Sequence, residues 1–280
     1  MAEITAAMVA KLREMTNAGV MDCKKALAEA NGDLNAAVDI LRKKGAATAS
    51  AKAAREAREG VIARYIAPGG RLGVLVEVNC ETDFVARNDL FRAFAEEVAL
   101  KLAENPAIDL NPDRETAVAK IRENIKIPRH ARMDVNGNGM VAAYIHTGAK
   151  VGVLVEVGAG KEATVGNDEF KQLVKDITLQ IAAGHPLVVS REQVPANVLA
   201  KEREIAAEQV KHKPPQAIAK IVDGKLEKFY QTYCLLDQGF VKKNSEVSVK
   251  EHIGSVAKPL GDEVTIRRFV RFQVGEATGP

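Results

Sequence analysis

The chain has 280 residues, of which 40 are Lys or Arg and 37 are Asp or Glu, so its formal net charge is only +3. This length is enough for about two domains with a substantial core. The weak charge and the few aromatic residues (eight Phe, four Tyr and no Trp) argue against a surface that binds nucleic acid. We therefore expect no direct nucleic-acid partner.

The cysteines and the N-terminal residues bear on the cellular compartment. Cys23, Cys80 and Cys234 are odd in number and far apart, so we expect reduced, structural thiols rather than a zinc or redox site. The segment from Met1 to Thr5 lacks the charged-then-apolar pattern of a signal peptide. No apolar run approaches membrane-spanning length. These features predict a cytoplasmic protein that does not enter a membrane.

Residues 1–45 are predicted to form three short helices. Thr5 can cap the first helix, and the break at Asn17-Ala-Gly19 separates it from the second. Asp33 can cap the third helix, and Gly45 is expected to end it. The apolar stripes of the three helices consist of Met8, Leu12 and Met15, then Cys23, Ala26, Leu27 and Ala30, then Leu34, Ala37, Val38 and Leu41.

The segment that follows, residues 46–59, consists mainly of Ala, Lys, Arg and Glu. It has no wide apolar stripe, which is typical of a solvated helix or a flexible linker. We expect such a linker to let the three-helix unit move relative to the rest of the chain.

The next part of the chain contains an internal repeat without gaps. Residues 62–103 align with residues 141–182 at a constant offset of 79, with 15 identities in 42 positions. Average composition would give about 3 identities by chance. Each copy has the pattern of strand, turn, strand, loop and helix, with hairpin turns expected at Pro68-Gly-Gly70 and Thr147-Gly148. The repeat therefore predicts two related units of sheet plus helix.

The two copies differ most in one loop, residues 79–87 in the first and 158–166 in the second. A kept scaffold with a changed loop is the pattern expected when the loop carries the function. The first copy has Phe84 at the position where the second has Ala163. Phe84 could insert into an apolar crevice of a partner, or it could fold back onto its own core, which composition alone favours. The repeat favours insertion, because a packing residue should be needed in both copies.

The second half contains an insertion with two helical patterns. Residues 195–212 and 216–233 are separated by Lys213-Pro-Pro215, which must break a helix, so we predict an antiparallel hairpin of helices. Each helix would be roughly 25 Å long. The hairpin could project toward a partner or lie on the core. We also expect a helix at Arg114–Ile125 and a strand at Thr265–Val274.

No motif for catalysis or metal binding is present in the sequence. Gly158-Ala-Gly-Lys161 is not a phosphate-binding loop, because Val155 and Glu162 stand where that motif needs Gly and Ser or Thr. Glu77 and Glu156 recur at equal repeat positions and are expected to be strand-face charges paired with Arg or Lys. We therefore predict no catalytic residue, no metal, no cofactor and no enzyme activity.

Two segments carry a family resemblance. Thr16–Leu27 followed by Asn31-Gly-Asp33 is one, and Glu77-Val-Asn-Cys-Glu-Thr-Asp-Phe-Val-Ala-Arg87 is the other. Both resemble signatures of the bacterial translation elongation factor Ts (EF-Ts) family. Weaker support comes from Tyr144-Ile-His146 and from Ile221–Leu226. The resemblance covers nearly the whole chain.

The resemblance implies an α+β fold with an N-terminal three-helix domain like the ubiquitin-associated (UBA) domain. Two related core subdomains and an inserted antiparallel helical hairpin would follow. On this basis we expect the three-helix domain at 1–45, the linker at 46–59, the first core subdomain at 60–140 and the second at 141–280. The hairpin would span about 191–233.

The resemblance also implies a function. The family exchanges guanine nucleotide on the translation GTPase elongation factor Tu, so the expected partner is that GTPase and the expected process is polypeptide elongation. The residues expected to dislodge Mg²⁺ and act as a wedge are Thr82, Asp83, Phe84 and Val85. The residues expected to bind the partner elsewhere are Arg13, Val20, Met21 and His146. From the sequence pattern alone, Val20 and Met21 would be core residues.

The chain departs from the family pattern in places, since Asn17, Arg122 and Gly239 replace residues that are often Gly, Gly and Pro. It also stops at Pro280, whereas some relatives continue into a further helix. Two other functions remain as alternatives: a small-molecule enzyme with a site between the two halves, and an adaptor built on the three-helix unit that binds ubiquitin-like proteins or nucleic acid. The sequence leaves the oligomeric state open.

Overall fold

The computed structural model describes residues 4–16 and 18–276. The expectations that concern Met1, Asn17 and Pro280 lie outside these residues. Within them the fold is mixed α+β, with two antiparallel sheets of three strands and helices around them, which confirms the predicted fold class at this level.

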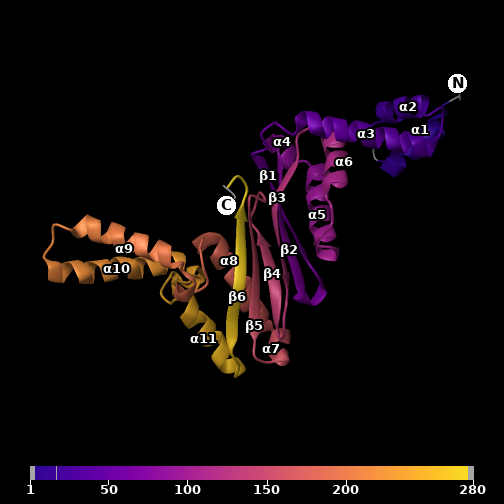
Figure 1. The fold of residues 1–280 in the computed structure, drawn as a ribbon. Helices are drawn as coiled ribbons and strands as arrows, with labels where there is room; N and C mark the ends of the chain where they lie inside the picture. The colour runs from indigo at the N-terminus through magenta and orange to yellow at the C-terminus, as the bar shows by residue number, and fades with distance from the viewer. Residues whose placement is uncertain (1–3, 17, 277–280) are drawn as a thin grey trace.

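The N-terminal part forms three helices that share a small apolar core (Figure 1). These are α1 (Ala6–Thr16), α2 (Val20–Glu29) and α3 (Leu34–Lys52). The carboxylate of Asp33 caps α3 by accepting a hydrogen bond from the amide of Ala36 at 3.0 Å, as predicted. The fully buried residues of this core are Leu12, Cys23, Ala26, Leu27 and Ala37.

The prediction that Gly45 ends the third helix was wrong. Helix α3 continues to Lys52 and packs against α6 (Asn111–Ile121). A Cβ atom on Gly45 would lie 3.6 Å from the carbonyl oxygen of Glu115, so this glycine serves the close approach of two helices. Ala49 is buried in the core of the first sheet, so residues 46–52 are not a solvated linker. Helix α3 thus joins the N-terminal helices to the core.

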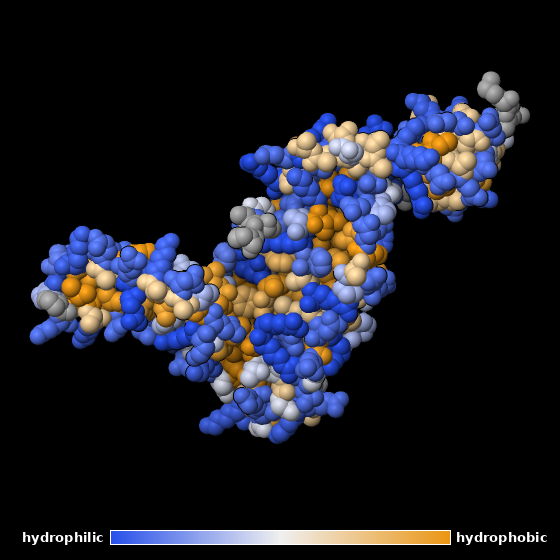
Figure 2. All heavy atoms as spheres, viewed as in Figure 1, coloured by the Kyte–Doolittle hydropathy of each residue, from blue (hydrophilic) through white to orange (hydrophobic). Residues whose placement is uncertain are grey.

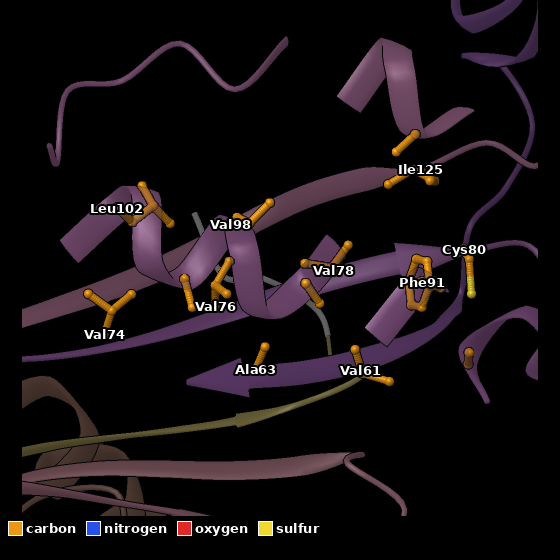
Figure 3. Close-up of a cluster of buried hydrophobic side chains, with 14 of the residues drawn as sticks. Val61, Ala63, Val74, Val76, Val78, Cys80, Phe91, Val98, Leu102 and Ile125 are labelled. Atoms are coloured by element: carbon orange, nitrogen blue, oxygen red, sulfur yellow. The ribbon is translucent and has the colours of Figure 1, made fainter. Parts of the chain in front are cut away.

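The first sheet has the strand order β1-β2-β3 and is antiparallel throughout. Its strands are β1 (Glu59–Ile66), β2 (Leu72–Cys80) and β3 (Lys126–Asp134). Pro68–Gly70 forms the turn between β1 and β2, as predicted. Helix α5 (Asp89–Glu104) covers one face of this sheet, and Figure 3 shows Phe91, Val98 and Leu102 packed against the valines of β2.

The second sheet repeats this plan with the order β4-β5-β6. Its strands are β4 (Gly139–Ile145), β5 (Val151–Ala159) and β6 (Val264–Gln273). Helices α8 (Asp168–Gly184) and α11 (Val249–Leu260) pack on its outer face. The predicted final strand is therefore present. The aligned repeat copies are equivalent elements, with β1, β2 and α5 matching β4, β5 and α8.

The two sheets pack face to face, which gives four layers in the order helix, sheet, sheet, helix (Figure 1). Gly73 and Gly152, which occupy equal repeat positions, lie at this contact. A Cβ atom on Gly73 would come within 2.5 Å of Val141, and one on Gly152 would overlap Ile62. The side chains buried between the sheets are Ile62, Leu75, Met133, Val141, Leu154 and Phe272. Strand β2 is consequently buried on both faces.

Glu77 and Glu156 are buried strand-face charges with arginine partners, as predicted. Glu77 pairs with Arg129 of β3 at 2.7 Å. Glu156 pairs with Arg267 at 2.9 Å and with Arg268 at 2.7 Å, both from β6. These arginines hold the pKa of Glu156 below its ordinary value although burial opposes this.

The helical hairpin projects from the core (Figure 1), so the alternative in which it lies on the core was wrong. It consists of α9 (Ala196–Val210) and α10 (Pro215–Tyr233). At its base, Arg191 pairs with Glu227 at 2.8 Å and with Asp237 at 2.7 Å. The hairpin has its own apolar seam, in which the buried residues are Ala206, Val210, Val222 and Leu226.

Three features of the fold differ from the sequence predictions or were not predicted. Helix α6 spans Asn111–Ile121 instead of 114–125, because Arg122 has a left-handed φ of 66° and ends it. Strand β3 was not predicted. Helix α11 was also missed, although the capping box of Ser248 and Glu251 marks its start.

The described cysteines are free and buried, in agreement with the prediction of structural thiols. Burial raises the pKa of Cys80 to about 12 and that of Cys234 to about 11. Both thiols are therefore poor nucleophiles near neutral pH. Within the described residues, no helix is long and apolar enough to cross a membrane.

Candidate functional site

The loop that differs between the repeat copies folds as one helical turn, α4 (Asp83–Ala86). The hydroxyl of Thr82 caps this turn and accepts a hydrogen bond from the amide of Val85 at 3.3 Å. Phe84 lies on the outer side of the turn and is 82% exposed. The alternative in which Phe84 folds back onto its own core was therefore wrong.

The other side of the α4 turn is anchored in the protein core. Ala86 is buried, and Val85 packs against the core of the first sheet. Asp83 forms an exposed ion pair with Arg87, one helical turn later, at 2.9 Å. The four predicted wedge residues thus have distinct positions: Thr82 caps, Val85 anchors, and Asp83 and Phe84 face outward.

A carboxylate from a distant part of the chain holds the base of this loop. Glu123 accepts hydrogen bonds from the backbone amides of Glu81 at 2.9 Å and Thr82 at 3.0 Å, and from the hydroxyl of Thr82 at 2.6 Å. In return, the carboxylate of Glu81 accepts from the amide of Asn124 at 2.6 Å. Sequence reasoning missed Glu123, because only the pairing of β2 with β3 brings it to the loop.

The equivalent loop in the second copy forms the short helix α7 (Glu162–Gly166). The amide of Lys161, which aligns with Thr82, donates to the carboxylate of Asp262 at 2.9 Å. Ala163 is exposed at the position of Phe84. Both copies therefore present the same backbone feature, and only the first carries an aromatic side chain on it.

His146 lies exposed in the turn between β4 and β5, and the hydroxyl of Tyr144 is 3.0 Å from its Nδ1 atom. This turn lies at the same end of the core as α4. The amide of Ile62 in β1 donates to the carbonyl of Ala149 at 2.7 Å, and Glu59, whose β2 partner is Cys80, pairs with Lys150. The structure thus brings the His146 turn and the Phe84 loop to one end.

Arg13 lies on α1, and Val20 and Met21 lie on α2, whose Asp22 pairs with Arg122 at 3.8 Å. All three are exposed, and Val20 and Met21 are 49% and 63% exposed. The alternative in which Val20 and Met21 are core residues was wrong. Figure 2 shows apolar surface on this helical unit in a view that also shows apolar surface along the hairpin.

The structure provides little for an enzyme site between the two halves. Their contact is filled by apolar side chains of both sheets. One surface hollow of about 120 Å³ lies in the hairpin seam, and another of about 440 Å³ lies beside α6 and β3. In the described part of the chain, no group of three or more His, Cys, Asp or Glu side chains could hold a metal ion.

The fold and the candidate site define a class of protein: an α+β chain of two related halves, whose candidate residues are exposed side chains rather than the lining of a cleft. Comparison with known proteins identifies the family. Residues 81–276 match the sequence model of the family described as "Elongation factor TS". The chain therefore belongs to the elongation factor Ts family.

Individual relatives match over nearly their whole length. Elongation factor Ts of Symbiobacterium thermophilum is 45% identical over 285 residues, covering 99% of this chain and 93% of the relative. That of Trichlorobacter lovleyi is 43% identical, with 98% and 93% covered. That of Chloroherpeton thalassium is 43% identical, with 99% and 100% covered.

Proposed function

We propose that this protein is the guanine nucleotide exchange factor for elongation factor Tu in polypeptide elongation, and that it is not itself an enzyme. It binds the GDP form of the GTPase, dislodges Mg²⁺ and promotes release of GDP, so that GTP can bind. Membership of the elongation factor Ts family supports this proposal. We place this function in the cytoplasm.

The exchange follows from a coupling free energy between two ligands of the GTPase. GTPases hold their nucleotide through a backbone phosphate cradle and a Mg²⁺ ion. A factor that binds the empty GTPase more tightly must weaken nucleotide binding by the same ratio. An acceleration of ten-thousandfold would require about 5.5 kcal/mol, which is within reach of one buried aromatic side chain and several docking contacts.

The observation that carries the proposal is the exposure of Phe84, at 82%, on an anchored helical turn. Burying a Phe side chain in an apolar site stabilises a complex by about 1.5–3 kcal/mol. A ring held outward on α4 gains this energy only in a partner. We propose that Phe84 enters an apolar crevice of elongation factor Tu and that Thr82, Asp83 and Val85 accompany it, which displaces Mg²⁺.

The remaining candidate residues would hold the complex together. Arg13, Val20 and Met21 would dock the N-terminal helices on the GTPase domain. His146 would contact the region of the phosphate-binding loop, which fits its position at the same end as α4. The hairpin of α9 and α10 projects away from the core (Figure 1), so its surface is available to a further part of a partner.

We retain the predicted domain division as part of this proposal. The N-terminal helices would be a UBA-like domain, and residues 60–140 and 141–280 would be the two core subdomains, with the hairpin inserted in the second. The predicted boundary after residue 45 falls inside α3, because that helix runs from Leu34 to Lys52.

The proposal is tested by stopped-flow release of a fluorescent GDP analogue from elongation factor Tu, with and without this protein. Acceleration that rises with the concentration of the factor and reaches a plateau is expected. A Leu187→Ala variant is the control for Phe84→Ala. It removes an apolar side chain that is 60% exposed on the second half, and so shows the effect of a general loss of surface apolarity. A folded sample that leaves the release rate unchanged would refute the exchange function.

A further inference from the structure

We propose that Glu123 is a positioning residue for exchange: its carboxylate fixes the base of the α4 turn, so that Phe84 is already oriented for insertion before the partner binds. The inference rests on the exchange function proposed above. It concerns a residue that does not touch the partner in this account and acts through the loop it holds.

The contacts of Glu123 are directed at one structural element. Its three accepted hydrogen bonds all come from Glu81 and Thr82, the two residues that lead into α4. The shortest, from the Thr82 hydroxyl at 2.6 Å, joins Glu123 to the group that also caps the turn. Because hydrogen bonds to a charged acceptor are stronger than neutral ones, this arrangement restrains both the entry and the first residue of the turn.

Glu123 is itself fixed by the residues on each side of it. Arg122 ends α6 in a left-handed conformation, and its carbonyl accepts a hydrogen bond from the Lys52 ammonium at 2.7 Å. Asn124 is buried, and its side chain donates to the carbonyl of Arg55 at 2.6 Å. The carboxylate therefore projects from a segment that is tied to the end of α3 and to the chain that follows it.

The physical benefit of this arrangement is preorganisation. An exposed loop that must become ordered on binding loses side-chain and backbone freedom at that moment, which reduces the free energy left for binding. A turn restrained in the free protein has lost that freedom already. The direction of the Phe84 ring also matters, because an aromatic side chain that enters its crevice at the wrong angle would not displace Mg²⁺.

The second repeat copy provides a matched comparison within the same chain. Asp262, which precedes β6 as Glu123 precedes β3, accepts from the amide of Lys161 at 2.9 Å and from the hydroxyl of Thr164 at 2.5 Å. Both halves therefore use a carboxylate to hold the turn that follows the central strand. Only the first half adds Phe84 to that turn, so a general structural role and a positioning role can be separated.

The experiment compares Glu123→Gln with Asp262→Asn in the stopped-flow release assay. Glu123→Gln keeps the shape but replaces the charged acceptor with a neutral amide, which weakens the hydrogen bonds from the two backbone amides and can bond the Thr82 hydroxyl only by accepting on its remaining oxygen or by donating to it. We expect the maximal release rate at saturating factor to fall about tenfold, with a smaller change in the half-saturating concentration. Asp262→Asn should leave the maximal rate within about twofold of the unchanged protein.

The background of Phe84→Ala distinguishes positioning from general stability. If Glu123 acts only by orienting Phe84, Glu123→Gln should reduce the rate by less than about twofold in a chain that already lacks this ring. A full tenfold reduction in that background would overturn the proposal. So would equal effects of Glu123→Gln and Asp262→Asn, or an unchanged rate for Glu123→Gln.

Two further measurements keep the test decisive. Thr82→Val replaces the hydroxyl that donates to Glu123 with a methyl group of similar size, so it should also slow release. This variant serves as the test if Glu123→Gln does not fold. Amide hydrogen exchange at Glu81 and Thr82 in the free factor should be faster in Glu123→Gln. If the unchanged protein fails to accelerate release, the exchange function itself is wrong, which is a different outcome from equal rates in the variants.

Discussion

Two phenylalanines of the first repeat copy, seven residues apart, illustrate how burial separates structural from functional roles. Phe91 is completely buried and has an identical counterpart, Phe170, in the second copy. Phe84 is 82% exposed, and its counterpart is Ala163. The ring needed by the scaffold is present twice, and the ring that the scaffold does not need is present once. This contrast supports a role for Phe84 outside the chain's own stability.

The contrast predicts opposite results for stability. Phe84→Ala should change the free energy of unfolding by less than about 0.5 kcal/mol, because little of the ring is buried. Phe91→Ala should lower it by about 3–5 kcal/mol through loss of buried area and a residual cavity. Urea denaturation followed by circular dichroism measures both values. A loss above about 2 kcal/mol for Phe84→Ala would show that this ring supports the fold.

His252 gives the fold a dependence on pH. Its ring stacks on buried Phe240 with 4.0 Å between centroids, and its Nδ1 atom is buried with no hydrogen-bond partner in the described part of the chain. Burial, helped by Lys243 and Lys242 and opposed by Asp176, lowers the pKa of His252 below 6.5. Between this lowered pKa and pH 6.5, the unfolded chain therefore binds more protons at His252 than the folded chain does.

We accordingly expect the stability contribution of His252 to be complete above pH 6.5 and to be lost as the pH falls through its lowered pKa. His252→Phe keeps an aromatic ring and cannot titrate. Urea denaturation of both proteins at several pH values on either side of about 6.5 tests this. The free energy of unfolding should fall less steeply with acidification in His252→Phe, and parallel curves would contradict the assignment.

At the scale of elements, the repeat made most of the core predictable. Strands β1, β2, β4 and β5 and helices α5 and α8 were expected at nearly their observed positions, because their apolar periodicity is strong and occurs twice. Strand β3 was missed, since Lys126–Asp134 is an edge strand with Pro128 and several charged side chains. In the sequence its arginines look like polar surface residues, and only the pairing with β2 shows that Arg129 has a partner in Glu77.

The N-terminal boundary failed for a different reason. A glycine at position 45 is typical of a helix end, yet here it permits close contact between α3 and α6. This is a tertiary effect that the local sequence does not show.

The candidate site was predictable in part. The comparison of repeat copies singled out Phe84, and the family resemblance added Asp83, whereas Glu123 has no sequence signal and becomes visible only through the fold.

The packing of the two sheets gives a prediction about paired glycines. Gly73→Ala and Gly152→Ala should each lower the free energy of unfolding by about 1–3 kcal/mol, because the added Cβ atom would overlap side chains of the opposite sheet. Gly254→Ala, in the exposed part of α11 with no atom within 4 Å of its Cβ position, should instead raise it by about 0.5–1 kcal/mol. Thermal and urea unfolding distinguish the two cases, and neutral results at Gly73 and Gly152 would contradict the close approach.

At the scale of the whole molecule, the exposed candidate residues lie on separate parts of an elongated shape. The N-terminal helices and the hairpin extend from different sides of the four-layered core, and α4 lies between them (Figures 1 and 2). Such a shape can contact a partner at several distant points. In the proposed function, the N-terminal helices contribute binding and α4 acts on the nucleotide site, so loss of either should affect exchange differently.

The central claim is that the exposed ring of Phe84 drives release of GDP. The most direct test measures the maximal rate of GDP release from elongation factor Tu at saturating concentrations of the unchanged protein and of Phe84→Ala. The account predicts that Phe84→Ala lowers this maximal rate about tenfold or more, while the concentration needed for half-saturation changes little. Equal maximal rates for the two proteins would contradict the wedge mechanism and assign the acceleration to other contacts.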